Sequence, residues 1–129
     1  MAFREVSRPN KQEIMIMKWE EYHDDTTNMD YELPHFTMNG YNSQEDFYYE
    51  NNLSVFNTIF SCIEYAIINK LPQVPCFILD DFTMTITNQL YAEKLEECRV
   101  YFERNEMYEK CAQIIKLKDI EFELHANEL

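Results

Sequence analysis

The chain has 129 residues and a single glycine, Gly40, where an average usage of about 7% gives roughly nine. Glycine allows the backbone to adopt a positive φ or to approach a phosphate closely. Its near absence excludes the Gly-rich loops of dinucleotide-binding and P-loop proteins and the GxSxG turn of α/β-hydrolases. The length, with 46% hydrophobic residues, suits one domain with one modest core.

Acidic residues outnumber basic ones: 24 Asp and Glu against 11 Lys and Arg give a formal net charge of −13. Direct binding to nucleic acid or to an anionic membrane requires the opposite sign, so we expect neither. The natural counterpart is a protein partner with a basic surface. The same charge also fits a protein that is acidic only for solubility.

The sequence indicates neither a membrane span nor export. No apolar run approaches the roughly 18 residues of a transmembrane helix, and the first residues lack the apolar region of a signal peptide. We therefore expect a cytoplasmic protein. No CxxC pair occurs, so we expect reduced core thiols rather than a zinc site at the four cysteines, Cys62, Cys76, Cys98 and Cys111.

Charge is unevenly placed along the chain. Between Lys18 and Lys70 there is no Lys or Arg, and ten acidic residues occur there. Residues 1–50 are also rich in aromatic side chains and show neither a helical nor a strand period. We therefore predict an extended, acidic, aromatic-rich arm over residues 1–50. Its candidate partner-binding residues are Trp19, Glu20, Glu21, Tyr22, Asp24, Asp25, Asp30, Tyr31, Glu45, Asp46, Phe47, Tyr48 and Tyr49.

Residues 51–129 are predicted to form a compact, mostly helical domain. A helix begins at Asn52 or Ser54, either of which can cap it. It ends by Lys70, because Pro72 disfavours helical conformation before it. A small β-hairpin follows over about residues 74–87, with its turn at Asp80 and Asp81. The first helix has an apolar stripe of Leu53, Phe56, Ile59, Phe60, Ile63, Ala66 and Ile67.

Two further helices are predicted in the last third. The first begins at Thr87 or Asn88, and a short break at residues 104–106 separates it from the second. A connection this short makes the pair an antiparallel αα-hairpin. The predicted fold class is α+β, mostly helical, with an extended N-terminal arm. The candidate buried residues are Tyr91, Leu95, Cys98, Tyr101 and Phe102 on the first helix and Tyr108, Cys111, Ala112, Ile115, Ile120 and Phe122 on the second.

Residues 89–118 resemble a UVR-type helical hairpin, through Leu95-Glu96-Glu97-Cys98, Tyr101-Phe102-Glu103 and the run from Glu106 to Ile115. That family has a Leu-Glu-x-small pattern, then an acidic-aromatic-Glu-Lys-small-Ala step and an aliphatic residue. Ile115 and Lys116 stand where the family has a basic-acidic pair. The resemblance implies a protein-docking hairpin of the kind found in nucleotide-excision and protease-adaptor proteins.

The whole chain also resembles the small acidic proteins of tailed bacteriophages, with short helices, Asn- and Tyr-rich loops and no catalytic signature. This resemblance implies a viral protein in the host cytoplasm or in the virion. Near the C-terminus, Ile120, Phe122 and Leu124 alternate with acids. This pattern is similar to the tail motifs that insert into sliding-clamp pockets, although packing of Phe122 on its own helix stripe is the alternative.

Two acidic clusters are candidates for metal-dependent chemistry: residues 20–25, which include His23, and the pair Asp80 and Asp81 after a buried strand. Consecutive residues diverge in any regular conformation, however, and the Asp pair fits a hairpin turn. The serines have no recognisable nucleophile framework. We therefore predict no catalytic residue, no metal and no cofactor.

The sequence favours a non-enzymatic interaction protein that docks its acidic arm on the basic surface of a protein partner such as nucleic-acid machinery. It would act as a charge-mimic inhibitor or as an adaptor. One alternative is a virion structural or assembly component whose arm binds neighbouring subunits. The other is a small metal-dependent hydrolase that uses Asp80, Asp81 and residues 20–25. The oligomeric state stays open, a homo-oligomer or virion subunit included.

Overall fold

The computed structural model describes the backbone of residues 18–128 and the side chains of residues 18–121 and 123. It is an α+β fold, as predicted, with helices over roughly half of the chain. In chain order the elements are β1 (Lys18–Asp24), β2 (Met29–Phe36), α1 (Gln44–Glu50), α2 (Asn52–Ile68), β3 (Gln73–Leu79), β4 (Phe82–Thr87), the 3-10 turn η2 (Asn88–Leu90), α3 (Tyr91–Arg104) and α4 (Tyr108–Glu128).

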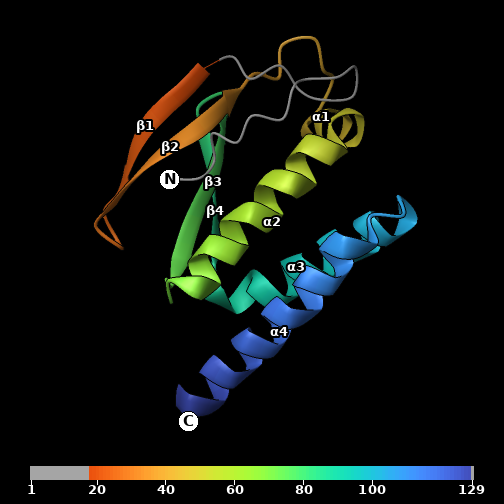
Figure 1. The fold of residues 1–129 in the computed structure, drawn as a ribbon. Helices are drawn as coiled ribbons and strands as arrows, with labels where there is room; N and C mark the ends of the chain where they lie inside the picture. The colour runs from red at the N-terminus through yellow and green to blue at the C-terminus, as the bar shows by residue number, and fades with distance from the viewer. Residues whose placement is uncertain (1–17, 129) are drawn as a thin grey trace.

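The four strands form one mixed sheet in the order β1-β2-β3-β4. β1 with β2 and β3 with β4 are antiparallel hairpins. β2 and β3 run parallel, with the register pairs His35–Ile78 and Phe36–Leu79. α1 and α2 make the crossover between these two strands, and α2 lies across the front of β3 in Figure 1. The predicted hairpin over residues 74–87 is confirmed, but the sheet is larger than that hairpin.

The prediction of an extended arm is wrong for residues 18–50. This stretch forms β1, β2 and α1, and Tyr31, Leu33, Phe36 and Phe47 are at most 3% exposed within the central core. Because β2 is an interior strand, Leu33 and Pro34 are both buried, which hides the two-residue alternation that marks a half-exposed strand. Residues 1–17 of the predicted arm lie outside the described residues.

α1 is a helix that the sequence analysis missed. The Ser43 hydroxyl caps it by accepting a hydrogen bond from the Asp46 N–H at 3.1 Å. Phe47 is its one buried residue, and its ring packs 6.0 Å from that of Phe36. A single buried residue produces no helical period, so a seven-residue helix of this kind leaves little trace in the sequence.

α2 confirms the predicted first helix. Asn51 is its N-cap residue, one position before the predicted cap, and the helix ends at Ile68, ahead of Pro72. The predicted stripe is only partly right, because Leu53, Phe56 and Ile59 are half-buried. The buried residues of α2 are Val55, Phe60, Cys62, Ile63, Ala66 and Ile67.

With one glycine available, the turns place other residues at positive φ. Lys70 (56°) follows α2 and Glu106 (59°) follows α3. Both close Schellman motifs: the Leu71 N–H donates to the Ala66 carbonyl at 2.9 Å, and the Met107 N–H to that of Phe102 at 2.8 Å. For a residue with a Cβ, the left-handed conformation at positive φ is less favourable by roughly 1–2 kcal/mol. The hydrogen bonds of these motifs therefore hold Lys70 and Glu106 in a conformation that their side chains disfavour.

α3 and α4 pack as an antiparallel pair joined by residues 105–107, and α3 also packs against α2. The Cys111 Sγ lies 3.6 Å from the Arg99 carbonyl, and the Lys118 ammonium lies 3.0 Å from Glu96. The C-terminal end of α4 extends beyond the rest of the molecule (Figure 1). Within residues 18–128, no helix combines the length and the apolar character needed to cross a membrane.

The predicted buried stripe of α4 is wrong at the exposed Tyr108, Ala112, Ile115 and Ile120, while Cys111 packs against the core and the side chain of Phe122 lies outside the described residues. Tyr108, Ile115 and Ile120 are 63%, 54% and 42% exposed, whereas Ile114 and Leu117 are buried. Neighbouring helical residues point about 100° apart, and α4 has apolar side chains on both faces. The face that meets α3 is therefore decided by the connection between the helices and not by composition. On α3 the prediction is confirmed for Tyr91, Leu95, Cys98 and Phe102, while Tyr101 is half-buried.

All four cysteines are free thiols, as predicted: Cys62, Cys76 and Cys98 are buried, and Cys111 is half-buried. Burial raises the pKa of Cys98 to about 12, which makes it unreactive at neutral pH. These thiols therefore serve as small core residues.

An ion-pair network joins α3 to α4. The Glu96 carboxylate accepts hydrogen bonds from Nε and Nη2 of Arg99 at 2.9 and 2.7 Å and from Nζ of Lys118 at 3.0 Å. These bonds, Arg99 first, lower the pKa of Glu96 to about 2. Through Lys118 this network links α4 to α3.

We predict that E96Q lowers the free energy of unfolding by about 1 kcal/mol at neutral pH, a value reduced for solvent screening because the carboxylate is 42% exposed. The folded-state pKa is depressed, so the stabilisation is present above the unfolded pKa near 4.5 and is lost as the pH falls towards 2. Chemical denaturation of both proteins across this pH range measures the difference. E97Q, which removes a surface pair with Lys94, is the matched control. Equal losses in both variants, or a difference that persists at the acid end, would contradict the assignment.

Candidate functional site

The β1–β2 hairpin divides its side chains between two faces. Directly opposed residues of an antiparallel pair point to the same side. The register therefore places one set together, which we call the outer face: Trp19, Glu21, His23, Asp30, Glu32 and the buried Pro34. The inner face consists of Lys18, Glu20, Tyr22, Asp24, Met29, Tyr31, Leu33 and His35.

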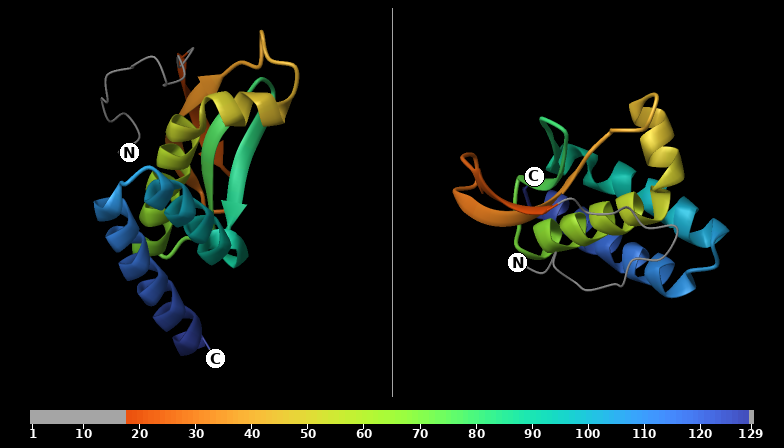
Figure 2. Two further views of the ribbon diagram at one scale, coloured as in Figure 1. Left: turned by 90° about the vertical axis from the view of Figure 1, so that its right-hand side faces the viewer. Right: turned by 90° about the horizontal axis from the view of Figure 1, so that it is seen from above.

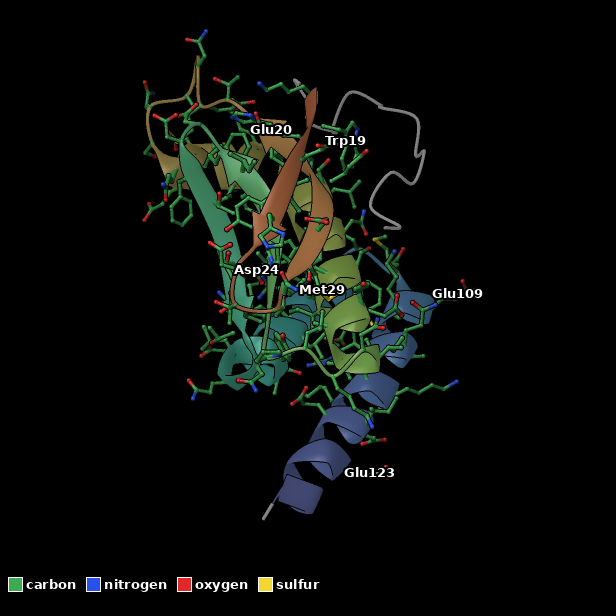
Figure 3. The ribbon with its side chains drawn as sticks, turned by 90° about the vertical axis from the view of Figure 1, so that its left-hand side faces the viewer. Trp19, Glu20, Asp24, Met29, Glu109 and Glu123 are labelled. Carbon is green, nitrogen blue, oxygen red and sulfur yellow. The ribbon has the colours of Figure 1, made fainter. Side chains whose placement is uncertain are left out.

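The inner face packs into the protein. Tyr31 and Leu33 are buried, and Tyr22 and Met29 pack against the core. The Tyr31 ring makes an edge contact with Tyr65 of α2 at 6.3 Å. Figure 3 shows this hairpin with Trp19 and Glu20 at one end and Asp24 and Met29 at its turn.

Burial removes three residues from the candidate partner-binding set. Tyr31, Asp24 and Phe47 are 3%, 4% and 0% exposed, so none of these three side chains lies open to a partner in the folded protein. Phe47 packs edge-on against Tyr41 at 5.2 Å. Nothing in the local sequence separates these two aromatic side chains from exposed ones, because Tyr31 packs on Tyr65 of α2 and Phe47 packs on Phe36 of β2.

The Asp24 carboxylate closes the hairpin turn and ties it to β3. Its Oδ1 accepts hydrogen bonds from the Thr26 N–H at 3.2 Å and from Nε2 of Gln73 at 3.0 Å. Its Oδ2 accepts one from the Thr27 hydroxyl at 2.9 Å. Asn28 completes the turn at a φ of 56°, a conformation that Asn tolerates. Asp24 is therefore a structural residue that fixes where the outer face points.

We predict that D24A lowers the free energy of unfolding by about 2 kcal/mol, because three donors lose a buried acceptor. Thermal or urea denaturation measures the change. D25N is the control, since the Asp25 side chain is fully exposed, and it should change stability by less than about 0.5 kcal/mol. If D24A proved as stable as D25N, Asp24 would not anchor the hairpin.

The outer face and its turn carry an excess of negative charge. Glu21 lies directly opposite Glu32, and the side chains of Asp25 and Asp30 are 100% and 90% exposed. His23 lies between the last two, with Nδ1 2.7 Å from Asp30 and Nε2 3.6 Å from Asp25. The hydrogen bond to Asp30, with the charges of both aspartates, raises the pKa of His23.

The remaining predicted partner-binding residues lie outside the outer face and differ in their contacts and exposure. Glu20 is already paired, with Lys18 at 3.1 Å and His35 at 3.0 Å, and the hydrogen bond to Lys18 lowers its pKa. Glu45 and Asp46 are exposed in the first turn of α1. Tyr49 is 80% exposed. Tyr48 is half-buried, with its ring 6.4 Å from Phe77.

His35 is a central polar residue that the sequence analysis did not single out. Its Nδ1 lies 3.0 Å from Glu20, and its Nε2 lies 2.8 Å from the backbone carbonyl of Asp80. The Asp80 carboxylate accepts hydrogen bonds from the Met38 N–H at 3.1 Å and the Thr37 hydroxyl at 3.3 Å. Asp80 thus forms the predicted hairpin turn and also holds the loop after β2.

The acids proposed for a metal-dependent hydrolase do not come together. Asp24 closes one turn, and Asp80 holds another. Among the residues that the structure describes, no three His, Cys, Asp or Glu side chains form a group that could hold a metal ion. Of the candidate tail motif, Ile120 is 42% exposed on α4, while the side chains of Phe122 and Leu124 lie outside the described residues.

Comparison with known proteins gives no match: no protein-family model, no curated protein and no solved structure matches this chain. The resemblance of residues 89–118 to a UVR-type hairpin and that of the whole chain to tailed-bacteriophage proteins therefore stay predictions. The geometry of the described residues is the basis on which a function can be argued.

Proposed function

We propose that the protein is a non-enzymatic interaction module that docks on a basic surface of a protein partner through the outer face of the β1–β2 hairpin. The placement of charge is the observation that carries this proposal. Residues 19–69 contain no Lys or Arg, and the exposed carboxylates of Glu21, Asp25 and Asp30 lie together on the hairpin.

The register of the hairpin supports a cationic ligand. The register places the exposed Glu21 on the outer face, two residues along β1 from His23. A Lys or Arg of a partner placed against the Glu21 carboxylate forms a charge-assisted contact. Trp19 stands next along the same face and is half-buried, so it adds the aromatic contact that interfaces favour.

The charge sign also selects the class of partner. A phosphate backbone repels this face, whereas a protein surface that itself binds phosphate attracts it. Carboxylates at the rim steer the encounter, and apolar contacts supply most of the affinity. The role that follows is that of an adaptor or of a charge-mimic inhibitor that competes with nucleic acid for a basic protein surface.

We expect the triple variant E21Q/D25N/D30N to bind an arginine-rich peptide about tenfold more weakly than the wild type at low salt, since each lost charge weakens binding by about 0.5 kcal/mol. The matched control is E93Q/E109Q/D119N, which removes the same charge from exposed positions on α3 and α4. Fluorescence anisotropy of the labelled peptide at low and high salt measures both.

The control should change the affinity less than about threefold, and the wild type's advantage should shrink at high salt. Equal weakening in the two triple variants would mean that only net charge matters, and the hairpin would then not be the docking face. Unchanged binding in the hairpin variant would sink the proposal outright.

The pH dependence of binding provides a second test, because Asp30 raises the pKa of His23. Below that pKa the imidazolium cancels part of the negative charge of the outer face. As the pH rises through that pKa, which lies above the ordinary histidine value, the ring loses its proton while the carboxylates stay ionised. The affinity for the arginine-rich peptide should therefore rise as the pH passes from below that pKa to above it.

H23Q should bind with little pH dependence and should match the wild type at pH values above the pKa of His23. The same anisotropy titration measures it, and the arginines of the probe keep their charge throughout. A pH dependence that survives unchanged in H23Q would show that another group controls the binding.

A further inference from the structure

The two edges of the sheet differ in how they are protected against pairing. β1 carries Lys18, Glu20, Glu21, His23 and Asp24, and charged side chains are the usual means by which natural edge strands avoid pairing. β4 carries none: it has the sequence Phe-Thr-Met-Thr-Ile-Thr. The uncharged stretch runs from Phe82 to Ala92, in a chain with 27% charged residues.

The outer edge of β4 is open in the described structure. β4 is the last strand in the sheet order, and Figure 2 (left) shows no further strand of residues 18–128 beside it. The irregularity in the β3–β4 ladder lies in β3, between Pro75 and Phe77, so β4 itself runs without a bulge. Phe82 at its start is 50% exposed, and Leu90 just beyond it is 42% exposed.

We propose that β4 is a homodimerisation edge, at which β4 pairs antiparallel with β4 of a second copy. Each copy carries a formal charge of −13, so two copies repel each other over most of their surface. The neutral β4 edge lets the backbones approach without opposing carboxylates. The acidic β1 edge does not, which makes β4 the edge where a second copy fits.

Charge also fixes the direction of pairing. Asp80 and Asp81 directly precede β4, so a parallel arrangement would place the two Asp pairs side by side. An antiparallel arrangement centred on β4 separates them along the strands by about 20 Å or more. That distance exceeds the Debye length of about 8 Å at physiological salt. Antiparallel pairing also gives the closed two-fold symmetry of most homodimers.

The register is restricted by the two faces of the strand. Ile86 is buried and Met84 packs against the core, so Phe82, Met84 and Ile86 face the helices and the three threonines face the other way. A two-fold axis perpendicular to the sheet brings side chains of the same face opposite each other only when it passes midway between a residue and the same residue of the second copy. An axis at Met84 places Thr83 of one copy opposite Thr85 of the other. An axis at Thr85 places Thr85 opposite its own copy. Both registers form cross-strand threonine pairs, which stabilise antiparallel sheets.

Such a dimer has one continuous sheet with the two acidic hairpins at its far ends. It would present two outer faces to a partner that has repeated basic sites. One six-residue strand buries less area than a standard interface, so we expect micromolar rather than nanomolar affinity. The dimer proposal does not depend on the proposed function, because β4 lies at the opposite edge of the sheet from β1, which carries the proposed docking face.

Light scattering and sedimentation of the full chain test the proposal. We expect the average mass to rise from 15.7 kDa towards twice that value as the concentration increases to about 1 mM. Higher salt should strengthen the association, because it screens the repulsion between acidic copies. T85E should dimerise at least about tenfold more weakly, while Q113E, with the same added charge on an exposed position of α4, should dimerise like the wild type.

Disulfide trapping provides a readout that does not depend on T85E folding. Directly opposed residues have Cβ atoms about 5 Å apart, so oxidised T85C should cross-link to itself if the axis passes through Thr85. If the axis passes through Met84, a mixture of T83C and T85C should cross-link instead. Q113C is the control. The proposal is overturned if the wild type stays monomeric, if T85E and Q113E associate alike, or if neither pairing cross-links faster than Q113C.

Discussion

The short parallel pairing of β2 with β3 is the contact on which the rest of the fold depends. It has the register pairs His35–Ile78 and Phe36–Leu79. Asp80 reinforces it from the next turn: its N–H donates to the Phe36 carbonyl at 2.9 Å, and its own carbonyl lies 2.8 Å from His35 Nε2. Through this junction the first hairpin joins the second, and the Phe36 ring reaches Phe77 in the core at 5.8 Å.

This junction turns an acidic, aromatic segment into a two-sided element. Tyr31 and Leu33 are buried on one side, while Glu21 and Asp30 stay exposed on the other. A face held on a folded sheet is already ordered before a partner binds. Binding therefore does not include the loss of conformational entropy that ordering a flexible segment would require. The proposed docking face and the neutral β4 strand then lie at opposite edges of one sheet.

The sequence predicted the elements whose signals are local. The α2 helix has a helical period and a proline after it, and the β3–β4 hairpin has alternation and an Asp-Asp turn. The sequence did not predict β2, because Leu33 and Pro34 are both buried. Their burial follows from the neighbouring strands of the sheet and not from the pattern of β2 itself. The exposure of Asp25 and Asp30 could be expected because their side chains are charged. The burial of Tyr31 could not, because it depends on packing against α2, which is distant in the chain.

Native-state hydrogen exchange of the full chain tests most directly the claim that the first hairpin belongs to the core. The β2–β3 junction predicts that the amides of Leu33 and Phe36 are protected to nearly the same extent as those of β3, because both strands open in the same global unfolding. Rapid exchange throughout residues 18–36, while β3 stays protected, would contradict the account and would return this segment to the status of a separate arm.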